Sequence, residues 1–257
     1  MMKIKYVTPS IALLLFTSIA GQANASVFGN PYMGVSLAWD HMGGKSYGSL
    51  KNFMGNTVTF TDGRHLSSNR VNGYFFVGTS YDLPSFPLFI SPEFQIGQGS
   101  VKSQLRGTNV NDLDMGQGVN RYAQRSLEPK LSRELNTSFV LRVGSKIMES
   151  GRLYGLVGID VSHFKYIYTF EEADTAAQEI ISAPRFTKKK WKTAPTFGIG
   201  IEKDVAKVRV GLEGRIALYG PIKTFRARVV GGDTESVSTK IKPYVSSLML
   251  RLSYALN

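Results

Sequence analysis

The chain of 257 residues contains no cysteine. This absence excludes a disulfide scaffold, a thiolate metal site and a cysteine nucleophile. The three histidines, His41, His65 and His163, lack the spacing of metal ligands, so we expect no metal. After residue 25 there is also no apolar run near the ~20 residues that a helix needs to cross a bilayer. The chain beyond this point is therefore soluble, peripheral or a β-barrel.

The N-terminus has the pattern of an export signal. Lys3 and Lys5 form a short basic region, residues 11–19 are an apolar run too short to span a membrane, and residues 23–25 fit the small-x-small rule for cleavage after Ala25. We expect residues 1–25 to be a signal peptide; a buried first helix is the alternative. A net charge of +12 is compatible with nucleic acid, anionic lipid or another acidic surface as partner. Export from the cytoplasm argues against nucleic acid.

Eight segments alternate between large apolar side chains and small or polar ones, which is the period of a β-strand. Each is near the ~9–11 residues that a tilted strand needs to cross a bilayer. The segment 71–81 is the least regular, because Tyr74 and Phe76 interrupt its alternation. The eight segments are residues 32–42, 71–81, 86–98, 135–148, 152–168, 192–203, 208–218 and 244–256.

The second face of these segments holds mainly glycine, serine and alanine with isolated charges. Such a face would be unusual against water, but it suits the crowded interior of an eight-stranded barrel. Lipid cannot hydrogen-bond to the backbone, so spanning strands must close on themselves. We therefore predict an all-β fold: a closed eight-stranded antiparallel up-and-down transmembrane β-barrel with its large apolar side chains facing hydrocarbon.

Ten charged residues lie on the second face, five of each sign. Buried charges must be paired, so a balanced set predicts a charge network inside the barrel. We assign to this network Glu93, Arg142, Asp160, Glu213, Arg215 and Arg251. For the other four, a position at a water-filled barrel end is an equal alternative; these are Asp40, Lys146, Glu202 and Arg209.

The connections between the segments alternate in length. Outer-membrane barrels place short turns in the periplasm and long loops outside. We thus predict three periplasmic turns, at residues 82–85, 149–151 and 204–207, and four extracellular loops, at roughly 43–70, 99–134, 169–191 and 219–243. Aromatic residues near the segment ends suggest two membrane girdles, with chance placement as the alternative. Trp39, Trp191 and Tyr244 fall near the outer ends, and Tyr81, Phe86 and Tyr254 near the inner ends.

Two of the long connections are basic. The residues that we assign to a basic loop patch are Lys188, Lys189, Lys190, Lys192, Lys223, Arg226 and Arg228, and the last connection also carries Lys240 and Lys242. Such a patch suits the phosphates of lipopolysaccharide, or an anionic host or envelope surface. A solvated basic rim that only anchors the barrel is the alternative.

Three stretches of sequence, with the export signal, resemble a known group of proteins. These are residues 31–37 (PYMGVSL), 196–202 (TFGIGIE) and 248–257 (LMLRLSYALN). The chain resembles the eight-stranded outer-membrane barrels that include the OmpA transmembrane domain, the opacity proteins and the major-surface-protein antigens. The ending Leu256-Asn257 departs from the aromatic ending usual in this group. The resemblance implies that residues 26–257 form one barrel domain in the bacterial cell outer membrane. A second departure is that no residues follow the last segment, so we expect no peptidoglycan-binding domain.

The group's known roles are those of surface antigens, adhesins and structural proteins, so the resemblance implies no catalytic site and no cofactor. A narrow channel and a lipid-modifying barrel enzyme are the alternative functions. Ser162, His163 and Asp160 could suggest a hydrolase. Neighbours on a strand point to opposite faces, however, so Ser162 and His163 are not expected to meet.

Overall fold

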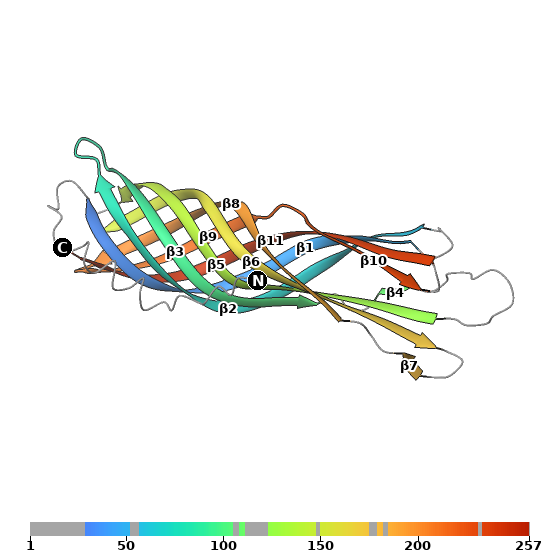
Figure 1. The fold of residues 1–257 in the computed structure, drawn as a ribbon. Helices are drawn as coiled ribbons and strands as arrows, with labels where there is room; N and C mark the ends of the chain where they lie inside the picture. Colours follow the sequence, from blue (N-terminus) through green and yellow to red (C-terminus); the bar gives the residue numbers. More distant parts are fainter. Residues whose placement is uncertain are drawn as a thin grey trace, which may run out of the picture.

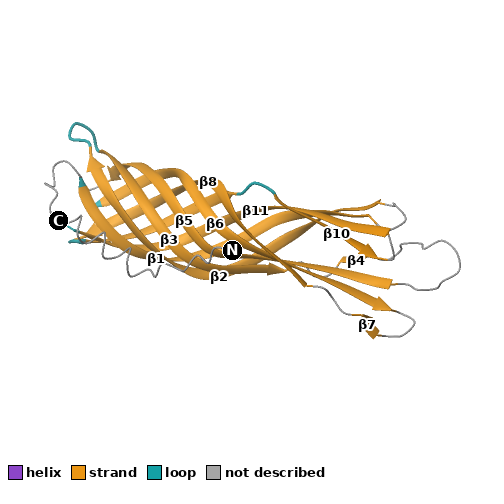
Figure 2. Ribbon diagram, in the orientation of Figure 1, coloured by secondary structure: helices purple, strands orange, loops and turns teal. Residues whose placement is uncertain are grey.

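The computed structural model describes residues 29–51, 57–104, 108–110, 123–147, 150–174, 179–181, 185–230 and 233–256. Within these ranges the chain forms strands joined by short connections (Figure 2). No helix in the described part is long and apolar enough to cross a membrane. The expected signal peptide lies outside the described residues.

Eight long strands form the barrel. They are β1 (Asn30–Lys51), β2 (Thr57–Asp82), β3 (Leu88–Gln104), β5 (Ala123–Ile147), β6 (Gly151–Asp174), β8 (Arg185–Val205), β9 (Val208–Leu218) and β11 (Asp233–Ala255). Each pairs antiparallel with the next, and β11 pairs with β1 from Tyr32↔Ala255 onward, which closes the ring (Figure 1). The predicted closed eight-stranded barrel is confirmed. Three short strands, β4 (Thr108–Val110), β7 (Glu179–Ile181) and β10 (Ile222–Val230), pair with its outer parts.

A belt of exposed apolar side chains surrounds the barrel, as the alternation predicts. On β1, Leu37 and Trp39 are each 61% exposed, whereas Ala38 and Asp40 between and beside them are fully buried. All eight long strands contribute, for example through Val35, Val71, Phe94, Phe139, Ile159, Ile199, Leu212 and Leu250. A surface of this kind is unfavourable in water and favourable in hydrocarbon. The barrel is therefore of the transmembrane type.

The irregularity of β2 comes from aromatic side chains that point into the barrel. Tyr74 and Phe76 are buried, and so are Tyr32, Phe89 and Tyr154 on other strands. Except for that of Phe89, these rings occupy space that neighbouring glycines leave free. A Cβ atom on Gly34 would clash with the ring of Phe76, and one on Gly200 would clash with that of Tyr154.

The predicted extracellular loops are largely strand, which corrects the sequence interpretation. The β1–β11 ladder continues to Lys51↔Ser236, and the β5–β6 ladder to Ala123↔Asp174. Beyond the apolar belt the two faces exchange character. Inward-facing positions become apolar and buried, as at Met42, Phe164 and Ile241. Many outward-facing positions become charged, for example Lys45, Lys189 and Lys242. The alternation continues with reversed polarity, because these parts lie in water, where the apolar face turns inward.

The outer parts of the strands separate into two sheets. Pairing between β2 and β3 is described no further outward than Gly73↔Gln98, and pairing between β8 and β9 ends at Thr196↔Ala217. We call the outer parts of β1, β2, β10 and β11 the β1 wing, and those of β3, β5, β6 and β8 the β6 wing (Figure 1). The wings meet at their base, where the rings of Phe164 and Tyr219 contact edge to face at 4.8 Å.

Candidate functional site

An ionic cluster fills the middle of the barrel. We call it the central cluster; it contains Glu93, Glu202, Glu213, Arg142, Arg215 and Arg251. Arg142 donates hydrogen bonds to Glu202 at 2.9 Å and to Glu213 at 2.8 Å, and it lies 3.1 Å from Glu93. Arg251 contacts the same three carboxylates, most closely Glu93 at 2.6 Å. Three guanidinium groups thus face three carboxylates, which limits the cost of burying charge.

Aromatic side chains complete the central cluster. The hydroxyl groups of Tyr32 and Tyr154 donate to Glu93 at 3.0 Å and to Glu213 at 2.9 Å. The guanidinium of Arg251 lies 3.9 Å from the ring centre of Phe76, and that of Arg142 lies 4.8 Å from the ring centre of Tyr154. Cation–π contacts of this kind are strongest where water is excluded. The inward-facing rings therefore stabilise the buried arginines.

A second cluster, the outer cluster, lies nearer the wings and joins opposite sides of the barrel. Arg133 of β5 lies 2.9 Å from Asp160 of β6 and 3.5 Å from Asp40 of β1. Asp40 also accepts hydrogen bonds from Asn72, Tyr74 and Ser247, at 2.5–2.6 Å. Asp160 accepts from Ser162 and Tyr219 at 2.6 and 2.5 Å. One arginine thus serves two carboxylates, and neutral donors satisfy their remaining lone pairs.

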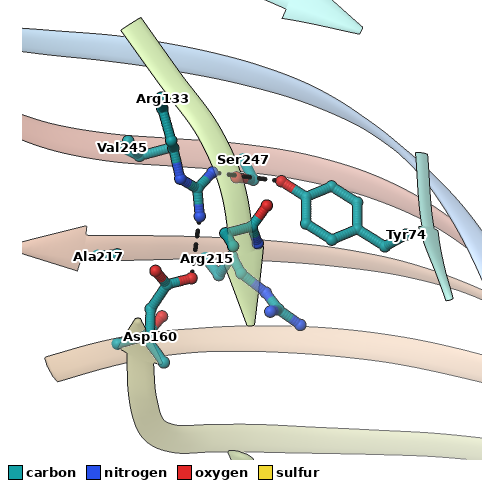
Figure 3. Close-up of a pocket in the computed structure, with 9 residues that line it drawn as sticks. Tyr74, Arg133, Asp160, Arg215, Ala217, Val245 and Ser247 are labelled. Atoms are coloured by element: carbon teal, nitrogen blue, oxygen red, sulfur yellow. Dashed lines mark hydrogen bonds and ion pairs between the residues drawn. The ribbon is translucent and has the colours of Figure 1, made fainter. Parts of the chain in front are cut away.

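A small cavity separates the two clusters (Figure 3). Its volume is about 10 Å³, and its walls include Tyr74, Arg133, Asp160, Arg215 and Ser247. A cavity needs roughly 10–15 Å³ to hold one water molecule. The described side chains therefore fill the lumen at two levels, with room for at most one water in this cavity.

A third set of ion pairs lies at the barrel end that carries the tight turns. Asp204 accepts from Arg209 at 2.6 Å and from Arg152 at 3.2 Å, and Lys146 donates to Asp82 at 2.8 Å. Partial burial opposes ionisation of Asp204, but Arg209 and Arg152 outweigh it and hold the pKa of this carboxyl below its usual value. Lys146 and Asp82 are substantially exposed, so their pair contributes little to stability.

The structure places all six residues assigned to the interior network inside the barrel. Five belong to the central cluster, while Asp160 belongs to the outer cluster. Of the four undecided residues, Glu202 joins the central cluster and Asp40 the outer one, and Lys146 and Arg209 lie at the turn end.

Sequence reasoning missed Arg133 and Arg152. A bulge in β5 between Arg133 and Asn136 inserts one residue, so Arg133 faces inward although it is two positions from the outward-facing Leu135. Strict alternation would have placed Arg133 in lipid. Arg152 lies an even number of residues from Asp160 on the same strand, so the alternation did predict that it faces inward.

The basic residues predicted in loops lie on strands, which is a further correction, whereas Lys192 is predicted at the start of a strand and lies on β8. Lys188, Lys189 and Lys190 are exposed on β8, and Lys223 is exposed on β10. Lys192 is half-buried, and its Nζ donates to the carbonyl oxygen of Pro221 at 2.7 Å. Arg226 and Arg228 lie on β10 opposite Val237 and Glu235; their side chains lie outside the described part.

A set of lysines lies on the outward face of both wings, directly beyond the aromatic residues Trp191 and Tyr244, and of the predicted basic residues it includes Lys189 and Lys223. We call this set the basic band; it contains Lys45, Lys165, Lys189, Lys223, Lys240 and Lys242. Its members are cross-strand neighbours in three pairs, Lys45↔Lys242, Lys223↔Lys240 and Lys165↔Lys189. Like charges placed opposite each other destabilise a sheet. Lys165 already lies 4.0 Å from the carboxylate of Glu134. The other two pairs therefore suit an external anion that neutralises them.

His41 and His163 lie on the outward face as well. His41 bonds to Asn69 at 2.6 Å, and His163 lies 3.1 Å from Glu134 and 5.0 Å from the ring centre of Trp191. Ser162, in contrast, is fully buried in the outer cluster. Ser162 and His163 thus point to opposite sides of β6. Among the described residues no group of three His, Asp or Glu is placed to hold a metal.

Comparisons with known proteins find likeness in shape alone. No family model matches the chain, and no curated protein matches its sequence. The outer membrane protease OmpT of Escherichia coli is 11% identical over 92% of this chain and 100% of its own, with a TM-score of 0.47. OprG, an outer membrane protein of Pseudomonas aeruginosa, is 9% identical over 88% of this chain and 96% of its own, with a TM-score of 0.46. The attachment invasion locus protein Ail of Yersinia pestis is 11% identical over 86% of this chain and 99% of its own, with a TM-score of 0.30.

The fold and the site together define a class: a closed eight-stranded transmembrane β-barrel with an ion-paired interior. This is the architecture of the eight-stranded outer-membrane barrels that the sequence resembles. The likeness is architectural and carries no particular activity to this chain.

Proposed function

We propose that this protein is a structural surface barrel of the bacterial outer membrane whose basic band binds the phosphate groups of lipopolysaccharide. The observation that carries the proposal is the position of the lysines. Lys189 and Lys242 stand on the outward face, two residues along their strands from Trp191 and Tyr244, and their cross-strand partners are Lys165 and Lys45. In an outer-membrane barrel this is the level at which lipid headgroups meet the wall. Aromatic side chains mark membrane interfaces, and each lysine near an anionic surface contributes about 1 kcal/mol.

Binding to lipopolysaccharide is tested with the barrel in nanodiscs and lipopolysaccharide titrated into the solution. The double variant Lys45→Gln/Lys242→Gln is expected to bind roughly 10–30-fold more weakly, because two favourable charges are lost. Dephosphorylated lipopolysaccharide should bind the parent barrel equally weakly.

The matched control is Lys203→Gln/Lys207→Gln, which removes two exposed lysines at the turn end of the barrel. It should bind like the parent. Unchanged binding by the Lys45/Lys242 variant, or an equal loss in the control, would refute the proposal. Binding of a phosphate-free anionic polysaccharide instead would point to a host or envelope surface as the ligand.

The alternative functions lack a supporting observation. A narrow channel would need an open lumen, and the central and outer clusters occupy it. A lipid-modifying enzyme built on Ser162 and His163 would need the two side chains to meet, whereas they lie on opposite faces of β6.

A further inference from the structure

One half of strand β8 is paired on only one side. Residues 196–203 pair with both β6 and β9, but residues 185–195 pair with β6 alone. The chain leaves β9 at Leu218, and β10 then pairs with β11 in the other wing. Among the described residues, therefore, no strand pairs with the second edge of the outer half of β8. In Figure 1 the two wings diverge at this seam.

The seam is closed at its base and open above it. At the base, Lys192 donates across it to Pro221. Further out, Lys190 and Lys188 are exposed, although they pair in register with Phe164 and Tyr166, which are buried. Solvent thus reaches the outer half of β8 beside the unpaired edge. A free strand edge presents backbone N–H and C=O groups that another strand can pair with.

The charge along this edge selects its partner. Residues 185–195 carry Arg185, Lys188, Lys189, Lys190 and Lys192 and no carboxylate. Strand β10, across the seam, carries Lys223, Arg226 and Arg228 and again no carboxylate. Edge lysines oppose pairing with a second copy of the same chain. They favour a strand whose side chains are acidic.

We propose that the β8 edge, residues 185–195, is a docking site for an extended acidic peptide segment of another protein, which adds as a strand to the β6 wing. Main-chain hydrogen bonds supply the affinity, and the lysines select carboxylates at alternate positions of the peptide. The edge of eleven residues accommodates a segment of roughly six to nine residues, the length of an ordinary strand. This site is separate from the proposed lipopolysaccharide site, with which it shares only Lys189.

The test uses the barrel in nanodiscs without lipopolysaccharide and a labelled nine-residue peptide of alternating Thr and Glu. Binding is followed by fluorescence anisotropy. We expect binding by this peptide and none by its Thr-Lys counterpart. Two further peptides carry N-methyl groups on either the odd or the even amides. Because only alternate amides of a strand face its neighbour, one of these two peptides should lose at least tenfold in affinity and the other should bind normally.

Protein variants locate the site. Lys188→Glu/Lys190→Glu should weaken peptide binding at least tenfold, while Lys45→Gln/Lys242→Gln and the turn-end variant Lys203→Glu/Lys207→Glu should not. Each folded variant should show the same change in gel mobility on heating as the parent. Hydrogen exchange should slow within residues 185–195 when the peptide binds. Equal binding by both N-methylated peptides, no binding by the acidic peptide, or unchanged exchange in this segment would each overturn the proposal.

Discussion

Replacing Arg142 by methionine is expected to destabilise the folded barrel by about 3–5 kcal/mol, the usual cost of removing one partner from a buried ion cluster. Arg142 is 2% exposed and contacts Glu93, Glu202 and Glu213. Without it, these three carboxylates share two arginines in a space that excludes water. The free energy of unfolding, measured by denaturant titration in lipid vesicles, gives the loss directly.

Two variants control for this prediction. Arg142→Met/Glu213→Gln removes one charge of each sign, so it should recover part of the lost stability and reveal the coupling between the two side chains. Lys146→Met removes an exposed ion pair at the turn end and should change stability by less than about 1 kcal/mol. If Arg142→Met were no more destabilising than Lys146→Met, the central cluster would not hold the barrel together.

The second large effect concerns the lipid-facing surface. Ile199→Arg is expected to destabilise the barrel by about 2–4 kcal/mol, because it places a charge in hydrocarbon near the middle of the membrane. Ile199 is 71% exposed and lies between the other outward-facing apolar residues of β8. The same unfolding measurement in vesicles applies.

Thr187→Arg is the matched control for Ile199→Arg, since Thr187 is exposed on the same face of β8 but lies beyond the apolar belt. In that aqueous region the change should stay within about 0.5 kcal/mol. Equal, small effects of both substitutions would mean that Ile199 faces water, and the orientation of the barrel wall would be wrong.

The parts of this structure that follow from sequence are those where one local pattern repeats. Alternation alone assigned Ile199 to the outside and Glu213 to the inside, because a strand sends successive side chains to opposite faces. The requirement that buried charges be paired then grouped Glu213 with Arg142 and Arg251. The assignment by alternation and the pairing of charges both work here because these residues lie in the membrane-spanning part, where the outside of the barrel is lipid along the whole strand.

Other features escaped the sequence because they depend on contacts between distant segments or on a change of environment. The inward position of Arg133 follows from a bulge, and that of Phe76 depends on the space left by Gly34 on another strand. The wings were missed because polarity reverses at the membrane boundary. Where Met42 and Phe164 face inward, the apolar face no longer marks lipid, so a search for continuous lipid-facing strands ends there.

The most direct test of the account is the membrane depth of the two tryptophans. Trp39 and Trp191 are the only tryptophans in the chain and are 61% and 53% exposed on the outward face, at the outer edge of the apolar belt. In vesicles of lipids brominated at defined depths, their fluorescence should be quenched most by bromine close to the headgroup, and little by iodide in the water. Quenching by iodide without quenching by any brominated lipid would contradict the account, because the apolar belt would then face water.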